Sequence, residues 1–185
     1  MELQSLLNLR DVNVEELENR FKDLAQLLFQ EYHIQKGNEI YDFHEIEFYY
    51  YTNGHRDAIT YPRITEAGKW FFHQSGVDLT FKSDSENYGG ILIKSLKHGD
   101  EIISGPLKCT WILFDVLDAF DMKQNEYPLI VHNEKTEKEI FSKKRKIDFN
   151  KDDETNQAKA KNKYKEDYLN FVHFIDAEYL FYWKK

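Results

Sequence analysis

Two glutamates spaced two residues apart raise the first chemical question about this chain. Glu45 and Glu47 lie within FHEIEFYYYTNGHRD, residues 43–57, a run otherwise rich in aromatic side chains and isoleucine. Such a run predicts a β-strand, in which residues two apart project from the same face. The same face also carries Phe43, Tyr49 and Tyr51. A carboxylate surrounded by tyrosines can have a raised pKa and serve as a general acid or base near neutral pH.

The opposite face of this strand is the expected core contact. Its members are Ile40, His44, Ile46, Phe48 and Tyr50, with the histidine as the polar one. The glutamate face would then line a cleft, and neither carboxylate would have to be buried. The same pattern also fits a solvated strand face on which long polar side chains alternate with tyrosines and perform no chemistry. The strand pattern alone leaves both interpretations open.

Other reactive side chains fit no compact catalytic or metal-binding motif. His44, His55 and His73 lack the His-x-His and HExxH spacings of metal sites, so we expect no metal and no cofactor. Cys109 lies in an apolar run, which favours a small buried hydrophobe over a nucleophile. The basic run KKRK, residues 143–146, is more typical of a solvated edge, although it is the best local candidate for contact with nucleic acid.

The composition is typical of one globular domain spanning residues 1–185. The chain is 41% hydrophobic and 31% charged, and its length allows roughly two-thirds of the unfolded surface to be buried. The single cysteine excludes an intramolecular disulfide and favours a cytoplasmic location. We expect neither a signal peptide nor a membrane partner, because no suitable apolar run is present. A net charge of −8 argues against a large nucleic-acid-binding face but allows a local basic groove.

The elements that must position these residues follow from hydrophobic periodicity. Helices are predicted over 12–33, with Asn13 as N-cap, and over 105–120, starting near Pro106. Strands are predicted over residues 40–51, 68–76, 77–81, 91–97, 127–133 and 138–149. Residues 1–12 form an N-terminal extension, and residues 150–166 a charged loop or exposed helix. The sum predicts a single α+β domain with a curved, mostly antiparallel or mixed sheet flanked by helices.

The order of several fragments resembles that of the alkyladenine (3-methyladenine) DNA glycosylase family. The fragments are LAQLLFQ (24–30), FHEIEFYYY (43–51), HRDAITY (55–61), AGKWFFHQSG (67–76), GGILIKSL (89–96) and SGPLKC (104–109). Order and approximate spacing agree with the family over roughly residues 20 to 120. Each fragment alone is a weak match, and the shared order carries the resemblance.

The resemblance implies a fold, a chemistry and a set of site residues. Glu47 falls on the family's general base, which activates the water that attacks the sugar carbon, and a carboxylate there can also stabilise positive charge on the sugar. Tyr49 and Phe72 fall on the aromatic walls that stack on the extruded base. Lys94 replaces an arginine that orients water and phosphate. The expected substrate-binding set also includes His55, Arg63, Trp70 and His73.

Departures from the family pattern keep three functional hypotheses open. Lys94 keeps the charge of arginine but loses its bidentate fork, and Ser75 stands where the family has an aromatic wedge. His55 comes too early to match the family's histidine. The leading hypothesis is a DNA-repair N-glycosylase that hydrolyses the bond to a flipped, alkylated purine in damaged DNA. The alternatives are a non-catalytic module that binds a nucleoside, nucleotide or modified base, and an interaction protein that retains only the scaffold.

Overall fold

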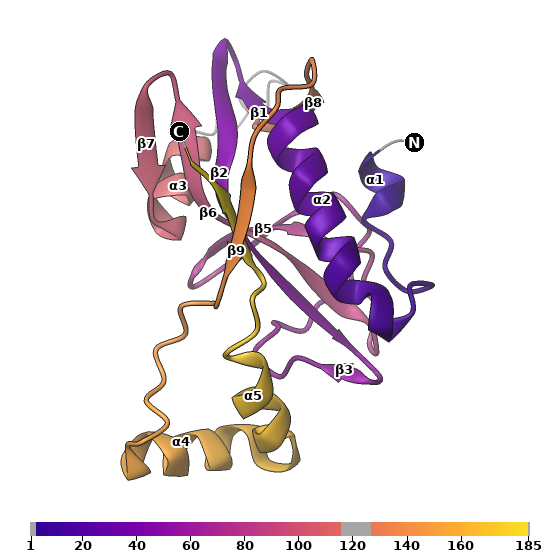
Figure 1. Ribbon diagram of the computed structural model, residues 1–185, viewed down its shortest axis with the longest axis vertical. Coiled ribbons are helices and arrows are strands. Elements are labelled where there is room, and N and C mark those ends of the chain that lie inside the picture. Colours follow the sequence, from indigo (N-terminus) through magenta and orange to yellow (C-terminus); the bar gives the residue numbers. More distant parts are fainter. Residues whose placement is uncertain (1–2, 116–126, 185) are drawn as a thin grey trace, which may run out of the picture.

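The computed structural model describes residues 3–115 and 127–184, which form an α+β domain built on one ten-stranded sheet (Figure 1). The helical elements are α1 (Leu3–Leu6), η1 (Val14–Glu16), α2 (Leu17–Glu31), α3 (Pro106–Leu113), α4 (Glu154–Tyr164), η3 (Lys165–Asp167) and α5 (Tyr168–Phe174). The strands are β1 (Tyr32–Lys36), β2 (Glu39–Thr52), β3 (His55–Arg56), β4 (Trp70–His73), β5 (Gly76–Thr80), β6 (Tyr88–His98), β7 (Glu101–Ser104), β8 (Leu129–His132), β9 (Ile140–Lys143) and β10 (Leu180–Trp183).

The sheet has the order β4-β5-β6-β2-β1-β8, and every described strand pairing is antiparallel. Strand β10 pairs with β2 and with β9, which extends the sheet around the long central strand. The predicted α+β class and mostly antiparallel sheet are therefore confirmed. The sheet is not strongly curled, which corrects the expectation of a curved sheet.

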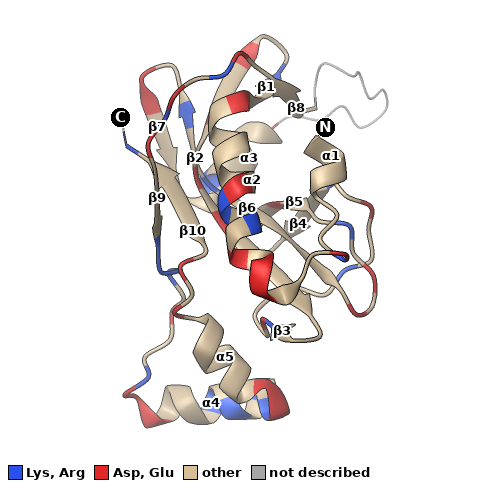
Figure 2. Cartoon of the chain, turned by 45° about the vertical axis from the view of Figure 1, so that its right-hand side comes forward, with Lys and Arg blue, Asp and Glu red and all other residues tan. Residues whose placement is uncertain are grey.

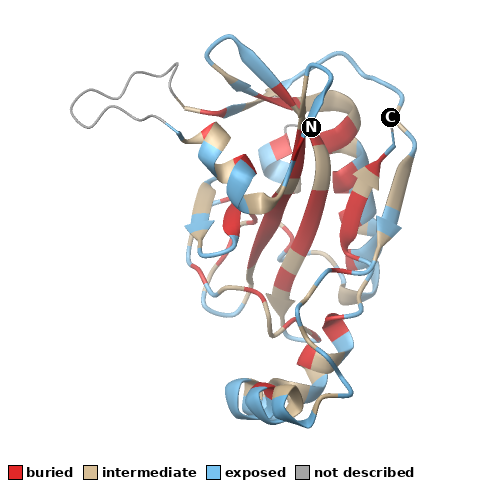
Figure 3. Ribbon diagram, turned by 90° about the vertical axis from the view of Figure 1, so that its left-hand side faces the viewer, coloured by how far each residue is buried: buried red, intermediate tan, exposed pale blue. Residues whose placement is uncertain are grey.

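Helix α2 forms where the apolar periodicity predicted it. Its buried stripe consists of Leu17, Phe21, Leu24, Ala25, Leu28 and Phe29. The Asn13 side chain accepts a hydrogen bond of 3.3 Å from the Glu15 backbone N–H and caps the 3₁₀ turn η1 that precedes the helix. The helix ends at Glu31, and the chain continues directly into β1. Helix α2 packs against β2, and Figure 3 shows buried residues concentrated along the strands of the sheet.

A β-bulge corrects the predicted faces of the central strand. The pairing of β2 with β6 shifts register between Phe43 and Glu45 and again between Glu45 and Ile46. Because an extra residue at a bulge changes the alternation, Phe43 belongs to the core together with Ile46, Phe48 and Tyr50. The predicted core residues Ile40 and His44 do not: the first is 51% exposed, and the second is partly exposed beside Trp183.

Two further predictions are corrected or limited by the structure. The helix expected over 105–120 is α3, which ends at Leu113, and residues 116–120 lie outside the described part of the chain. The strand expected over 138–149 is shorter and is β9. Helix α5 and the strands β1, β3, β7 and β10 were not predicted.

The charged segment 150–166 contains α4, which packs with α5 at one end of the molecule, apart from the sheet in Figure 1. Asp153 caps this helix by accepting hydrogen bonds from the Thr155 and Asn156 backbone N–H groups. A small apolar cluster, centred on Ala160, Phe171 and Ile175, holds the two helices together. None of the described helices is long and apolar enough to cross a membrane.

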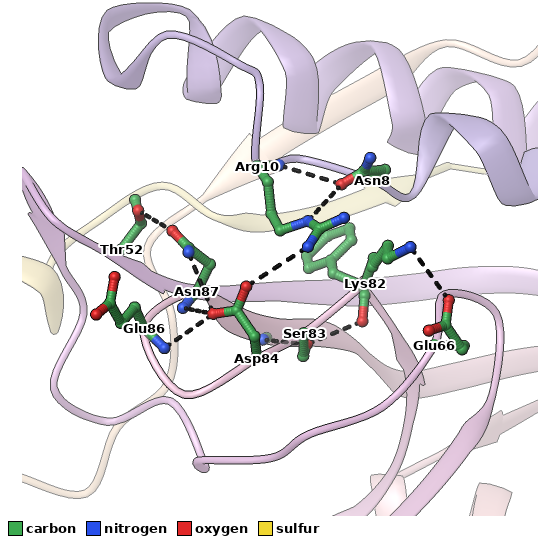
Figure 4. A network of polar contacts seen from close by, with 11 residues as sticks. Asn8, Arg10, Thr52, Glu66, Lys82, Ser83, Asp84, Glu86 and Asn87 are labelled. Carbon is green, nitrogen blue, oxygen red and sulfur yellow. Dashed lines mark hydrogen bonds and ion pairs between the residues drawn. The ribbon is translucent and has the colours of Figure 1, made fainter.

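The N-terminal residues are tied to the loop between β5 and β6 (Figure 4). Arg10 lies 3.6 Å from Asp84, whose carboxylate also accepts hydrogen bonds from the backbone N–H groups of Glu86 and Asn87. Thr52 donates a hydrogen bond of 2.5 Å to the side chain of Asn87. These contacts fix the loop that leads into β6, the strand that carries Lys94.

Candidate functional site

The candidate site is a group of three side chains on the two central strands. The Tyr49 hydroxyl donates a hydrogen bond of 2.5 Å to Glu47 Oε1, and Lys94 Nζ lies 2.7 Å from Glu47 Oε2. Strand β2 supplies the glutamate and the tyrosine, and β6 supplies the lysine. The residues that the resemblance assigned to the general base, one aromatic wall and the replaced arginine therefore form one contact group.

Strand pairing explains why these residues meet. Glu47 on β2 pairs with Leu92 on β6, which in turn pairs with Asp78 on β5. Paired residues of antiparallel strands share a face, and so do residues two apart along one strand. Lys94 follows Leu92 by two positions, and Tyr49 follows Glu47 by two. The two central strands thus direct all of these side chains to one face of the sheet.

Glu47 is fully buried, which corrects the expectation that the glutamate face escapes burial. Its side chain is 0% exposed, whereas that of Lys94 is 15% exposed. A buried carboxylate requires hydrogen-bond donors or a counter-charge, and Tyr49 and Lys94 provide both. Burial, followed by the neighbouring Glu47 charge and the hydrogen bond to it, raises the pKa of Tyr49 above its usual range. The tyrosine therefore remains a hydrogen-bond donor to the glutamate.

Glu45 has a different environment from Glu47. It accepts a hydrogen bond of 2.9 Å from Lys143 Nζ, and this lysine also lies over the Tyr182 ring at 4.4 Å. The side chain of Glu45 remains 18% exposed. Glu45 thus forms a partly exposed ion pair with Lys143, whereas Glu47 is fully buried in its pair with Lys94.

A cavity of about 320 Å³ lies beside this group and has Tyr49 in its wall. Three other aromatic rings line it, those of Tyr61, His73 and Tyr164. Leu92 contributes to the wall between Tyr49 and the β5 side. A cavity of this size and aromatic character suits a small planar ligand, such as a nucleobase.

A second ionic cluster forms part of the cavity wall. Arg63 Nη1 donates a hydrogen bond of 2.7 Å to Asp78 Oδ2, and His73 Nε2 lies 2.9 Å from Asp78 Oδ1. The three side chains are at most 7% exposed. Arg63 also lies 4.0 Å from the Phe71 ring centroid. Two polar atoms of cavity-lining residues, Arg63 Nη2 and Thr60 Oγ1, are buried without a hydrogen-bond partner among the described residues.

The hydrogen bonds of His73 restrict it to an orienting role. Its Nε2 faces the Asp78 carboxylate, and its Nδ1 accepts a hydrogen bond of 3.2 Å from the Ser75 backbone N–H. With both ring nitrogens engaged, the imidazole has no free lone pair to act as a base toward the cavity. Its ring instead packs against that of Tyr61, with 4.7 Å between centroids. The predicted substrate-binding histidine thus lines the cavity as a planar surface.

Two glycines at the start of β6 make this arrangement possible. A Cβ atom on Gly89 would come within 2.1 Å of the Tyr49 backbone oxygen. A Cβ atom on Gly90 would come within 3.0 Å of Arg63 Nη1 and 2.9 Å of the Leu79 oxygen. Such distances exclude a larger residue unless the backbone moves. The sequence YGGILIK is therefore explained by close packing beside Tyr49 and Arg63.

Of the predicted site residues, Tyr49, Arg63 and His73 line this cavity, whereas Glu47 and Lys94 lie behind Tyr49 in its contact group and the other three lie elsewhere. Phe72 is 54% exposed and packs against Phe114 at 4.7 Å between ring centroids. Trp70 also packs against Phe114, and its ring N–H donates a hydrogen bond to the Pro128 carbonyl. Phe72 therefore does not form the expected second aromatic wall. Tyr61, which was not among the predicted site residues, lines the cavity instead.

His55 lies in the protein core rather than beside Glu47. Its ring nitrogens lie 2.8 Å from the Tyr50 backbone oxygen and 3.0 Å from the Tyr179 hydroxyl. It is 5% exposed, and burial lowers its pKa below the usual value. Its contacts fit a structural histidine that stays uncharged.

Sequence reasoning missed a second buried ion pair beside Tyr49. Arg145, from the KKRK run, donates hydrogen bonds of 2.6 and 3.2 Å to the two oxygens of Asp57, and both side chains are 0% exposed. The guanidinium also lies 4.9 Å from the Tyr49 ring centroid. The run was interpreted as a solvated edge, which is wrong for Arg145. A basic run carries no signal that distinguishes its one buried member from its neighbours.

The described residues contain no group of three or more His, Cys, Asp and Glu side chains that could hold a metal ion. Burial raises the pKa of the Cys109 thiol to about 12, so it is not a ready nucleophile at neutral pH. The chemistry available at the site is therefore that of Glu47 and the cations and hydroxyls around it.

No protein-family model matches the chain, and neither the curated proteins nor the solved structures include a match. Functional inference consequently depends on the residue order described above and on the geometry of the site.

Proposed function

We propose that the protein hydrolyses the N-glycosidic bond of an alkylated purine nucleotide whose base enters the 320 Å³ cavity. The observation that carries the proposal is the contact group of Glu47, Tyr49 and Lys94, with separations of 2.5 and 2.7 Å, which reaches the cavity wall through Tyr49. These residues come from two strands and were singled out separately by the order of motifs. Their convergence beside the cavity supports the proposal.

In this mechanism Glu47 takes a proton from water, and the water oxygen bonds to the sugar carbon as the bond to the base breaks. A purine nucleotide alkylated at N3 or N7 carries a positive charge on its base, which leaves as a neutral molecule, so no group has to protonate it. This agrees with the absence of a free acid–base nitrogen on His73. The rings of Tyr49 and Tyr61 provide surfaces that favour a cationic aromatic base.

Lys94 has to release Glu47 before water can reach the carboxylate. Its side chain is the more exposed partner of the pair, and a backbone phosphate next to the cavity would compete for its ammonium group. Once Lys94 turns toward that phosphate, Glu47 Oε2 is free to accept a hydrogen bond from water. Substrate binding thereby activates the base.

A non-catalytic module that binds a nucleoside, nucleotide or modified base is the second candidate. It is favoured by the complete enclosure of Glu47, both of whose oxygens are already in contact with Tyr49 and Lys94. The two unpartnered atoms in the cavity-lining residues, Arg63 Nη2 and Thr60 Oγ1, also indicate capacity for ligand hydrogen bonds. This candidate predicts binding without turnover.

The decisive experiment measures release of the free base from an oligonucleotide that contains one 7-methylguanine. We expect the wild-type protein to release it and Glu47→Gln to lose release by at least about a thousandfold, because the amide cannot take up the proton. Circular dichroism and thermal unfolding of the variant verify that it remains folded. Lys143→Gln, which affects the Glu45 pair and the contact with the Tyr182 ring but not Glu47, is the matched control and should keep near wild-type release.

Two results would reject hydrolysis. One is that Glu47→Gln releases base at the wild-type rate. The other is that the wild type releases no base from any alkylated oligonucleotide, while 7-methylguanosine raises its unfolding temperature. The second result supports the binding module instead. If neither release nor a thermal shift is seen, the cavity is not a nucleobase site.

A further inference from the structure

Positive charge is concentrated in one segment of this acidic protein. Residues 143–165 contain nine Lys and Arg against four Asp and Glu, whereas the whole chain has a net charge of −8. Figure 2 shows basic residues on α4, apart from the sheet. Such an asymmetry is the pattern expected where an acidic protein contacts a polyanion.

The first basic residues of this segment are already engaged within the protein. Lys143 pairs with Glu45, Arg145 with Asp57, and both Lys144 and Lys151 with Asp176. The KKRK run is therefore a poor surface for nucleic acid, although it was the best local candidate in the sequence. The basic residues left for a partner lie mainly on α4.

Helix α4 carries three exposed lysines, Lys159, Lys161 and Lys163. None of them forms an ion pair with a carboxylate in the described parts of the chain; Lys161 lies over the Tyr168 ring and Lys163 over the Tyr164 ring. Lys159 and Lys163 are four residues apart, so they lie on the same side of the helix, about 6 Å apart along its axis. This spacing is suited to successive phosphates of one strand.

The lysine side of α4 adjoins the candidate site. Lys163 and Tyr164 both line the cavity that contains Tyr49 and Arg63 in its wall. A polyanionic chain held by Lys159 and Lys163 therefore passes the cavity entrance, where one of its units can enter. No other described helix contributes to the lining of this cavity.

We propose that α4 binds the phosphate backbone of a nucleic-acid strand and presents one nucleotide to the cavity. This inference rests on the proposed function and assigns it a contact surface. A membrane is the less suitable partner, because the buried apolar residue of α4, Ala160, faces α5, and the exposed residues of the helix are polar except for the small Ala158. The acidic remainder of the protein repels phosphate, which confines contact to this surface.

The test compares two double variants with the same change of net charge. Lys159→Ala with Lys163→Ala removes the proposed contacts, and Lys22→Ala with Lys108→Ala removes two exposed lysines on α2 and α3. Fluorescence anisotropy of a labelled oligonucleotide is measured from low to high salt. We expect the α4 variant to bind about tenfold more weakly and to lose about 1.4–1.8 units of salt slope, and the control to stay within about twofold of wild type.

The inference is overturned if both double variants show the same affinity and slope, or if the wild type shows no salt-dependent binding. Equal dependence on α4 for anionic lipid vesicles would also overturn it, because the surface would then not be directed to nucleic acid. The Glu47→Gln protein separates this inference from the proposed function, because its binding should still depend on α4 although it releases no base. If the wild type binds through α4 but releases no base, the surface is supported and the hydrolysis is rejected.

Discussion

Two buried ion pairs flank Tyr49, and they differ in how completely they are closed. The Arg145–Asp57 pair is 0% exposed on both sides, and Arg145 also donates to the backbone oxygens of Phe48 and Phe174. The Glu47–Lys94 pair has one ion contact, and its lysine is 15% exposed. One pair is fully enclosed, and the other is partly exposed through the side chain of its lysine.

This difference teaches that burial alone does not define a functional carboxylate. Asp57 is enclosed by a bidentate arginine, which neutralises it and joins the segment after β9 to β2 and α5. Glu47 is equally buried, but the side chain of its partner Lys94 is 15% exposed. A fully enclosed pair is suited to hold the fold together, whereas a pair with a partly exposed cation is better placed to respond to a ligand.

The largest expected effect is the loss of the fully enclosed pair. Arg145→Met should lower the free energy of unfolding by about 3–5 kcal/mol, because it leaves the Asp57 carboxylate buried without a counter-charge. Glu47→Gln should lower it by about 1–3 kcal/mol, since the amide still accepts a hydrogen bond from Tyr49 and the Lys94 side chain is already partly exposed. Urea unfolding followed by circular dichroism measures both values.

The neighbouring Lys144→Met is the matched control for Arg145→Met. Lys144 is 64% exposed and lies 3.7 Å from Asp176, so its replacement should change stability by less than about 1 kcal/mol. Equal losses for Arg145→Met and Glu47→Gln would remove the distinction between the two pairs.

A smaller effect should appear in how the free energy of unfolding depends on pH, through His55 near the Arg145–Asp57 pair. Burial lowers the pKa of His55 below 6.5, with the Asp57 charge partly opposing this change. The unfolded chain therefore binds a proton more readily than the folded protein, and stability decreases as the pH falls below 6.5. His55→Gln should show a shallower decrease in urea midpoint between neutral and mildly acidic pH.

An identical pH profile for wild type and His55→Gln would show that His55 is not the group responsible. The slope, rather than the absolute stability, is the informative quantity, because the substitution also removes the contacts with Tyr50 and Tyr179.

The smallest effect concerns the affinity of the cavity beside Tyr49 for a ligand. Tyr61→Ala should weaken binding of a methylated nucleoside by about 1–3 kcal/mol, the value of one stacked aromatic ring. Phe72→Ala should leave affinity unchanged, because Phe72 is half exposed against Phe114. Isothermal titration calorimetry compares the two. A larger loss for Phe72→Ala would restore it as the second aromatic wall.

Local patterns were sufficient for much of the fold. The buried stripe of α2 and the Asn13 cap could be predicted because the periodicity of a helix is visible within its own short segment. The alternation of β2 could likewise be predicted over most of the strand. The bulge near Glu45 could not be predicted from the sequence, because it depends on pairing with β6, a strand about fifty residues away. It reversed the faces assigned to Phe43 and His44.

The sequence by itself determined the α+β class, the position of the central strand and the choice of Glu47, Tyr49 and Lys94 as a candidate group. Only the tertiary structure decided that Glu47 is buried, that Phe72 lies away from the cavity, and that Arg145 is enclosed while the α4 lysines remain exposed. The physical reason is that residue type and spacing express local preferences. Burial and charge pairing depend on which distant strands and helices come together.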